Sequence, residues 1–66
     1  MAKLSNRLRV LRAEKDISQE ELAKSVGVSR HTIMAIERGN YSPSVMLALE
    51  IAKYFKKPLE EVFSIH

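Results

Sequence analysis

Apolar side chains recur at helical spacing along most of the chain, and charged or turn-forming residues interrupt them. Over residues 4–15, Leu4, Leu8 and Leu11 are spaced four and three residues apart, with charged residues between them. This spacing predicts a first helix. Its start is open, because Asn6 is a suitable N-cap and residues 2–4 would then form an extended arm.

Residues 17–39 carry the clearest local signals and predict two short helices joined by a tight turn. Ser18 and Glu21 have the spacing of a capping box, which begins a helix. Gly27 suits the left-handed conformation that ends it, Ser29 can cap a second helix, and Gly39 can stop that helix. The apolar positions expected to face inward are Leu22, Ala23, Val26, Ile33 and Ile36.

The remaining residues predict two further helices. Ser44 can cap a fourth helix that runs from Val45 to about Phe55. Its expected apolar face consists of Val45, Ala48, Leu49, Ala52 and Phe55. Pro58 suits the first position of a fifth, short helix that ends at Phe63.

The stretch from residue 17 to residue 39 resembles the helix-turn-helix of phage-repressor and Cro-type transcription factors, the lambda-repressor-like family. The likeness rests on the motifs SQEELA, VGVS, TI and IERG, and it continues through YSPS to IAK. The resemblance implies an all-α, five-helix domain over residues 1–66, with the helix-turn-helix at about 18–38. Similar proteins often have Gly or Asn where this chain has Lys56, so we expect the fourth helix to end differently here.

Charge and composition agree with a small nucleic-acid-binding domain. Hydrophobic residues make up 45% of the 66 residues and charged residues 29%, and the net charge is +3. Residues 1–38 hold eight basic and five acidic side chains, whereas residues 39–66 hold three of each. The positive excess therefore lies in the half that contains the motif, as a phosphate-facing surface requires. Without a signal peptide or a long apolar run, we expect a cytoplasmic protein that contacts no membrane.

The resemblance makes the third helix the recognition element. Because Ile33 and Ile36 face inward, its outer positions are Arg30, His31 and, further along the helix, Met34, Ala35 and Arg38. The expected base-reading residues are Arg30, His31, Met34 and Ala35. Arginine donates two hydrogen bonds to guanine, and apolar side chains meet thymine methyl groups.

Gln19 resembles the phosphate-contacting glutamine of the family, at a helix N-terminus where free N–H groups attract phosphate. We expect six further phosphate contacts: Ser29, Thr32, Arg38, Asn40, Tyr41 and Ser44. Arg12 and Glu37 match a structural pair of the family, which joins the first helix to the recognition helix.

Enzyme chemistry is not indicated. Cysteine is absent, and the two histidines have no clustered acids with which to build a metal site. No glycine-rich phosphate loop occurs. We therefore expect no cofactor and no metal, and five helices leave no room for a small-molecule effector domain.

The C-terminal segment predicts the surface of a homodimer. Leu59, Val62, Phe63 and Ile65 are more apolar surface than a core this small can bury, so we expect part of it to stay exposed, with the N-terminal arm alongside. The alternative is that Phe63 and Ile65 fold back over their own domain.

The sequence thus predicts sequence-specific binding of a palindromic duplex DNA operator by a homodimeric transcriptional regulator, with repression as the expected effect. The alternative is an antitoxin or a protein-interaction module that acts through a partner protein.

Overall fold

Five helices and two short strands make up the fold. The computed structural model describes residues 2–66. The helices are α1 (Leu8–Lys15), α2 (Gln19–Val26), α3 (Arg30–Glu37), α4 (Val45–Phe55) and α5 (Leu59–Val62), and the strands are β1 (Leu4–Asn6) and β2 (Phe63–Ile65). The five predicted helices are therefore confirmed, with a small two-stranded sheet added.

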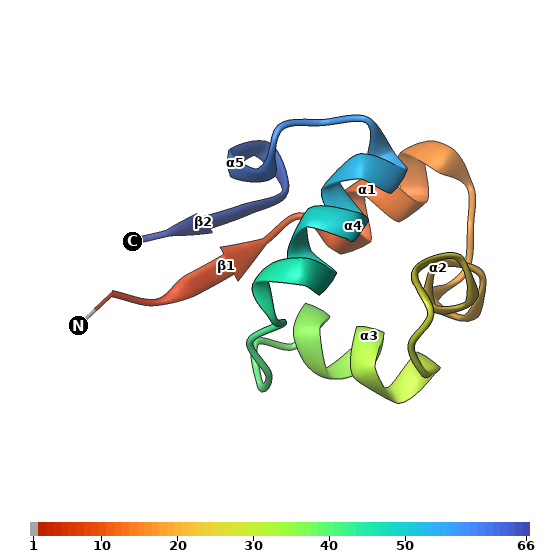
Figure 1. Ribbon diagram of the computed structural model, residues 1–66, viewed down its shortest axis with the longest axis horizontal. Coiled ribbons are helices and arrows are strands. Elements are labelled where there is room, and N and C mark those ends of the chain that lie inside the picture. The colour runs from red at the N-terminus through yellow and green to blue at the C-terminus, as the bar shows by residue number, and fades with distance from the viewer. Residues whose placement is uncertain (1) are drawn as a thin grey trace.

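The helices enclose one apolar core, and the two strands extend from it on one side. Figure 1 shows α3 along the lower edge, α2 at the right, α1 and α4 above, and both chain ends together at the left. The core combines residues from every helix: Leu8, Leu11, Leu22, Ala23, Val26, Ile33, Ile36, Leu47, Ile51, Ala52, Val62 and, from β2, Phe63. Helices α2 and α3 pack directly against each other, and α2 also packs against α4.

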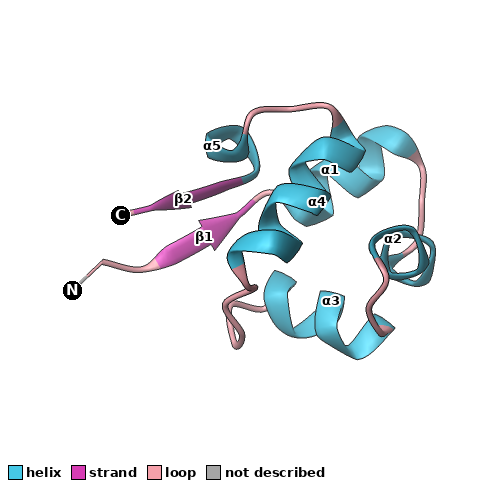
Figure 2. Ribbon diagram, viewed as in Figure 1, coloured by secondary structure: helices cyan, strands magenta, loops and turns pink. Residues whose placement is uncertain are grey.

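The N-terminal arm forms a strand, and α1 starts at Leu8 rather than Leu4. Strands β1 and β2 are antiparallel, with Leu4 opposite Ile65 and Asn6 opposite Phe63 (Figure 2). The N-cap of α1 is Arg7 and not Asn6, which lies one residue earlier and accepts at its Oδ1 a hydrogen bond of 3.1 Å from the Leu8 N–H. The expected arm alongside the C-terminus is confirmed, in the form of β pairing.

Two predictions about the C-terminal helices are wrong. Lys56 takes the left-handed conformation, with φ 57°, so α4 ends as it would with glycine there. Its N–H is hydrogen-bonded to the last turn of α4, which holds the strained residue in place. Helix α5 ends at Val62, because Phe63 leaves it in an extended conformation to pair with Asn6.

The apolar face predicted for α4 is only partly correct. Leu47 and Ile51 point into the core together with Ala52. Val45 and Leu49 point to solvent and are 76% and 51% exposed. The helix is therefore rotated relative to the prediction.

In the C-terminal segment, the buried and the exposed apolar residues also differ from the prediction. Val62 and Phe63 are 1% and 7% exposed, so both close the core of their own domain, and neither side of this pair stays open. Ile65 is 70% exposed and its strand partner Leu4 is 41% exposed. Phe63 thus folds back over its own domain and Ile65 does not.

Candidate nucleic-acid interface

The start of α2 is built by a reciprocal pair of hydrogen bonds. The Ser18 hydroxyl accepts from the Glu21 N–H at 3.0 Å, and the Glu21 carboxylate accepts from the Ser18 N–H at 2.9 Å. This capping box fixes the direction of the first turn and confirms the prediction from the sequence. Gln19 is the first residue of the helix, at the positive end of its dipole.

Helix α3 begins with polar residues, and one of its faces is apolar and buried. The Ser29 hydroxyl caps it by accepting from the Thr32 N–H at 3.2 Å. Ile33 and Ile36 are 0% and 1% exposed and anchor the helix to the core. Their burial leaves Arg30 and His31 exposed and Met34 and Ala35 partly exposed. Gly27 makes this arrangement possible, since its φ of 76° ends α2 and turns the chain toward α3.

Arg12 of α1 and Glu37 of α3 form a bidentate ion pair. Arg12 Nε donates to Glu37 Oε2 at 2.6 Å, and Arg12 Nη2 donates to Glu37 Oε1 at 3.0 Å. The Glu37 side chain is 2% exposed and that of Arg12 is 16% exposed. The pair joins the end of α3 to α1.

The hydrogen bonds of this pair set its protonation. Burial raises the pKa of Glu37, but the hydrogen bonds from Arg12 and Gln19, with the positive charges of Arg12 and Arg9, outweigh burial and leave this pKa below its ordinary value. The hydrogen bond to Glu37 raises the pKa of Arg12 despite burial. Both groups are therefore charged at neutral pH.

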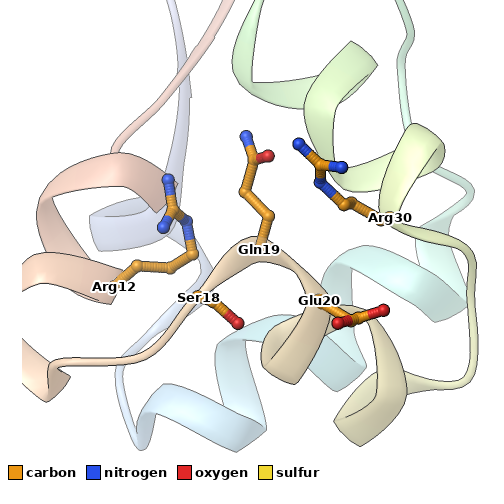
Figure 3. Close-up of a pocket in the computed structure, with 5 residues that line it drawn as sticks. All are labelled: Arg12, Ser18, Gln19, Glu20 and Arg30. Carbon is orange, nitrogen blue, oxygen red and sulfur yellow. The ribbon is translucent and has the colours of Figure 1, made fainter.

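One polar pocket brings the two helix starts together. Gln19 and Arg30 line it, with Arg12, Ser18 and Glu20 on the remaining walls (Figure 3). Gln19 Nε2 also donates to Glu37 Oε1 at 3.1 Å, a contact that the sequence did not predict. The pocket therefore links α1, α2 and α3 through side chains.

None of the other predicted phosphate-contacting residues lines this pocket. Thr32 lies within hydrogen-bond distance of the Ser29 hydroxyl, at 3.1 Å, and Arg38 is exposed just after α3. Asn40 and Tyr41 are exposed in the loop before α4. Ser44 caps α4 and lines a separate groove beside the turn that contains Gly27, so the structure does not bring Ser44 together with Gln19.

The chain matches a known protein family over most of its length. The family model described as helix-turn-helix matches residues 8–62, which covers all five helices. The chain belongs to the helix-turn-helix family. It is a DNA-binding regulator of the lambda-repressor-like type and not an enzyme.

Similar proteins support this assignment. The chain is 50% identical over 60 residues to an uncharacterised HTH-type transcriptional regulator of Methanocaldococcus jannaschii, covering 91% of each chain. It is 38% identical to the cryptic phage CTXphi transcriptional repressor RstR of Vibrio cholerae, over 91% of this chain and 54% of RstR. Among solved structures, the restriction-modification controller protein C.AhdI of Aeromonas hydrophila matches with a TM-score of 0.75 and 35% identity, over 82% of this chain and 78% of C.AhdI.

Asn6 is a structural residue of this helix-turn-helix domain that the sequence identified only as a possible cap. Its Nδ2 donates to the Ile36 carbonyl oxygen at 2.9 Å, near the end of α3. Together with its bond to Leu8, this contact fixes β1 against α3. No local sequence signal indicates it, because the two residues are 30 positions apart.

Within residues 2–66, no group of three or more His, Cys, Asp or Glu side chains is placed to hold a metal ion. None of the helices in this part of the chain has the length and apolar character that crossing a bilayer requires.

Proposed function

We propose that this chain is a homodimeric transcriptional repressor that binds a palindromic duplex operator in the cytoplasm and reads the major groove with α3. The observation that carries the proposal is the division of α3 into two faces. Ile33 and Ile36 are buried, while Arg30 and His31 stand exposed at the helix start. A helix anchored in this way can enter the groove with its N-terminal residues against the base edges.

Arg30 is the principal base reader in this proposal. Its guanidinium donates two hydrogen bonds to guanine O6 and N7, the commonest specific contact in the major groove. His31 reaches a neighbouring base edge or phosphate. Met34 and Ala35, which are partly exposed, contact thymine methyl groups.

The phosphate contacts surround the base readers. Gln19 offers a neutral donor at the positive end of α2, where phosphate is favoured. The contacts from α3 and the loop after it come from Ser29, Thr32, Arg38, Asn40 and Tyr41, and Ser44 contributes from the start of α4. These groups set the position of the domain on the duplex and carry no sequence information directly.

The dimer surface in this proposal is the outer part of the two-stranded sheet. Leu4 and Ile65 are exposed partners across β1 and β2, and they line one apolar groove with Leu59 and Phe63. Both chain ends extend away from the helices there (Figure 1). Within residues 2–66 the sheet has two strands only, so each strand has an open edge that a second copy can cover. Of the four residues predicted for the interface, Ile65 and Leu59 are the main contributors, because Val62 and Phe63 are buried in their own domain.

A dimer also fits what specific DNA binding requires. One small module buries little DNA surface, whereas two copies read two half-sites about one helical turn apart. The operator should therefore be palindromic. No cofactor or small-molecule effector enters this proposal.

Selection of bound duplexes from a random pool tests the function directly. The wild type should recover one palindromic site. Arg30→Ala should weaken that site by about 1–3 kcal/mol and relax its preference at one base pair of each half-site. A pool that stays random after selection with the wild type would refute sequence-specific binding.

Salt dependence separates this function from action through a partner protein. Binding to duplex DNA releases counterions, so the logarithm of the association constant should fall with the logarithm of salt concentration by about 0.9 for each neutralised phosphate. An antitoxin or adaptor that does not use DNA would show no such slope. A flat salt response would favour that alternative.

A further inference from the structure

Arg12 holds α1 against α3 and against the loop before α2. Its Nε and Nη2 donate to Glu37 at 2.6 and 3.0 Å, and its Nη1 donates to the Ile17 carbonyl oxygen at 3.3 Å. Arg12 also lines the polar pocket with Gln19 and Arg30 (Figure 3). The side of α1 that carries Arg12 therefore borders the candidate nucleic-acid interface, although Glu37 neutralises the charge of Arg12 itself.

Arg9 lies on the same side of α1, one turn before Arg12. Residues three positions apart are neighbours on the surface of a helix. The positive charge of Arg9 contributes to the lowered pKa of Glu37, which agrees with this placement. Arg9 is exposed, and the ion pair of Arg12 with Glu37 is the only one among residues 2–66. Arg9 is therefore a cation without an acidic partner beside the candidate interface.

The net charge of this region depends on Arg9. Two cations of the pocket, Arg12 and Arg30, are balanced by Glu20, which also lines the pocket, and by Glu37, which Arg12 binds. The pocket and its ion pair are thus neutral as a set. Arg9 adds the surplus positive charge that attracts a phosphate to this side of the domain.

We propose that Arg9 is a phosphate contact from α1, which holds this side of the domain on the duplex backbone. Its guanidinium donates charge-assisted hydrogen bonds to a phosphate, with a geometry that allows two parallel bonds. Because phosphates are the same at every base pair, the contact adds affinity and positions α3 in the groove without reading the sequence. This inference rests on the proposed function and extends the contact surface to the first helix, whereas the sequence indicated contacts only within residues 19–44.

Arg9→Gln and Arg7→Gln form a matched pair for the test. Each variant removes one positive charge from an exposed arginine at the start of α1, so each lowers the net charge from +3 to +2. Any loss of long-range attraction is therefore similar in both. At 3.6 residues per turn the two positions are about 200° apart around the helix, so Arg7 does not share the face of Arg9 and Arg12.

The measurement is the affinity for the duplex selected by the wild type, as a function of salt concentration. Losing one phosphate contact should reduce the slope of the logarithm of the association constant against the logarithm of salt by about 0.9. The ratio of wild-type to Arg9→Gln affinity should therefore fall about 3.5-fold between about 0.1 and 0.4 M salt. Arg7→Gln should keep the wild-type slope, and so should Arg9→Lys, which keeps the cation.

Sequence dependence is the second readout. Arg9→Gln should weaken the selected duplex and its variants at the base pair assigned to Arg30 by the same factor, since phosphate contacts carry no sequence information. Circular dichroism of each variant checks folding, and Arg9→Met replaces Arg9→Gln if the glutamine variant does not fold.

Equal salt slopes for Arg9→Gln and Arg7→Gln would overturn the contact while leaving DNA binding intact. A loss confined to the selected duplex would overturn it too, because Arg9 would then read a base. A wild type whose binding does not respond to salt would instead overturn the proposed function, and the inference with it.

Discussion

Replacing Glu37 by alanine removes the carboxylate that Arg12 and Gln19 share, and the structure sets the size of the effect. Three hydrogen bonds of 2.6, 3.0 and 3.1 Å end on this group, whose side chain is 2% exposed. Breaking a buried ion pair by removing one partner costs about 3–5 kcal/mol, because the other charge stays buried. Arg12 is 16% exposed and regains some water, so we expect the lower end, about 3 kcal/mol.

For a domain of 66 residues this loss is large. Total stability at this length is about 3–10 kcal/mol, and each kcal/mol shifts the melting temperature by about 4–8 °C. The melting temperature of Glu37→Ala, measured by circular dichroism, should therefore be about 12–24 °C below that of the wild type. Glu14→Ala, which removes an exposed carboxylate from α1, is the control and should change the unfolding free energy by less than about 0.5 kcal/mol.

A double-mutant cycle then isolates the pair. Arg12→Met and Glu37→Met should each destabilise the domain, but the double variant should recover part of the loss, because no charge is then left unpaired. We expect a coupling free energy of about 2–3 kcal/mol from urea unfolding. Additive single effects, with coupling below about 0.5 kcal/mol, would show that the two side chains do not interact in solution and would refute the reasoning.

Three further predictions follow from particular residues. Lys56→Gly should stabilise the domain by about 1 kcal/mol, because glycine adopts φ 57° without strain, and thermal unfolding of Lys57→Gly, next to it, should show no such gain. The pKa of Glu37 is lower in the folded state than in the unfolded chain, where it is about 4.3. At a pH between the folded and the unfolded pKa, the unfolded chain therefore binds more protons than the folded protein. The contribution of Glu37 to stability should therefore be complete above the unfolded pKa and fall as the pH is lowered through the folded pKa. The urea midpoint of Glu37→Met should lack this part of the pH dependence of the wild type. Ile65→Asp should make the protein sediment as a monomer, whereas Val10→Asp, at an exposed apolar position on α1, should leave the dimer intact; a wild type that is monomeric at high micromolar concentration would contradict the proposed dimer.

The caps and turns could be predicted from the sequence because their interactions are local. Ser18, Ser29 and Ser44 each accept a hydrogen bond from the N–H three residues later, and this spacing is visible in the sequence. Gly27 and Gly39 have positive φ, which glycine adopts more readily than other residues. Helix ends of this kind depend on few long-range contacts.

The strand pair could not be predicted, because neither strand carries a signal of its own. Each has three residues, too few to show alternation, and the partners are about 60 positions apart in the sequence. The spacing from Leu4 to Leu8 even continues the helical pattern of α1. Only the arrival of the C-terminus beside the N-terminus makes the extended conformation favourable there.

The candidate site likewise has features that the sequence predicts and one that it does not. The outer positions of α3 followed from the burial of Ile33 and Ile36, and the pairing of Arg12 with Glu37 followed from the family resemblance. The bond from Gln19 to Glu37 depends on the relative placement of α2 and α3, and sequence spacing does not specify it.

The orientation of α4 shows which part of an apolar pattern carries information. Eight of its eleven residues are Val, Met, Leu, Ala, Ile or Phe, so apolar residues occur at helical spacing on several faces. The predicted face is the one that includes Val45 and Leu49. Glu50 and Lys53 are its only charged residues, and at about 100° per residue they lie on one side of the helix. The opposite side contains Ala48, Ile51 and Phe55, which pack on or within the core, as Leu47 and Ala52 on either side of them also do. In a helix this apolar, the two charged residues locate the solvent face more reliably than the apolar majority locates the core, since Met46 and Leu49 lie on their side and are 72% and 51% exposed. Val45 lies nearer the opposite side, but it is the first residue of the helix and is 76% exposed.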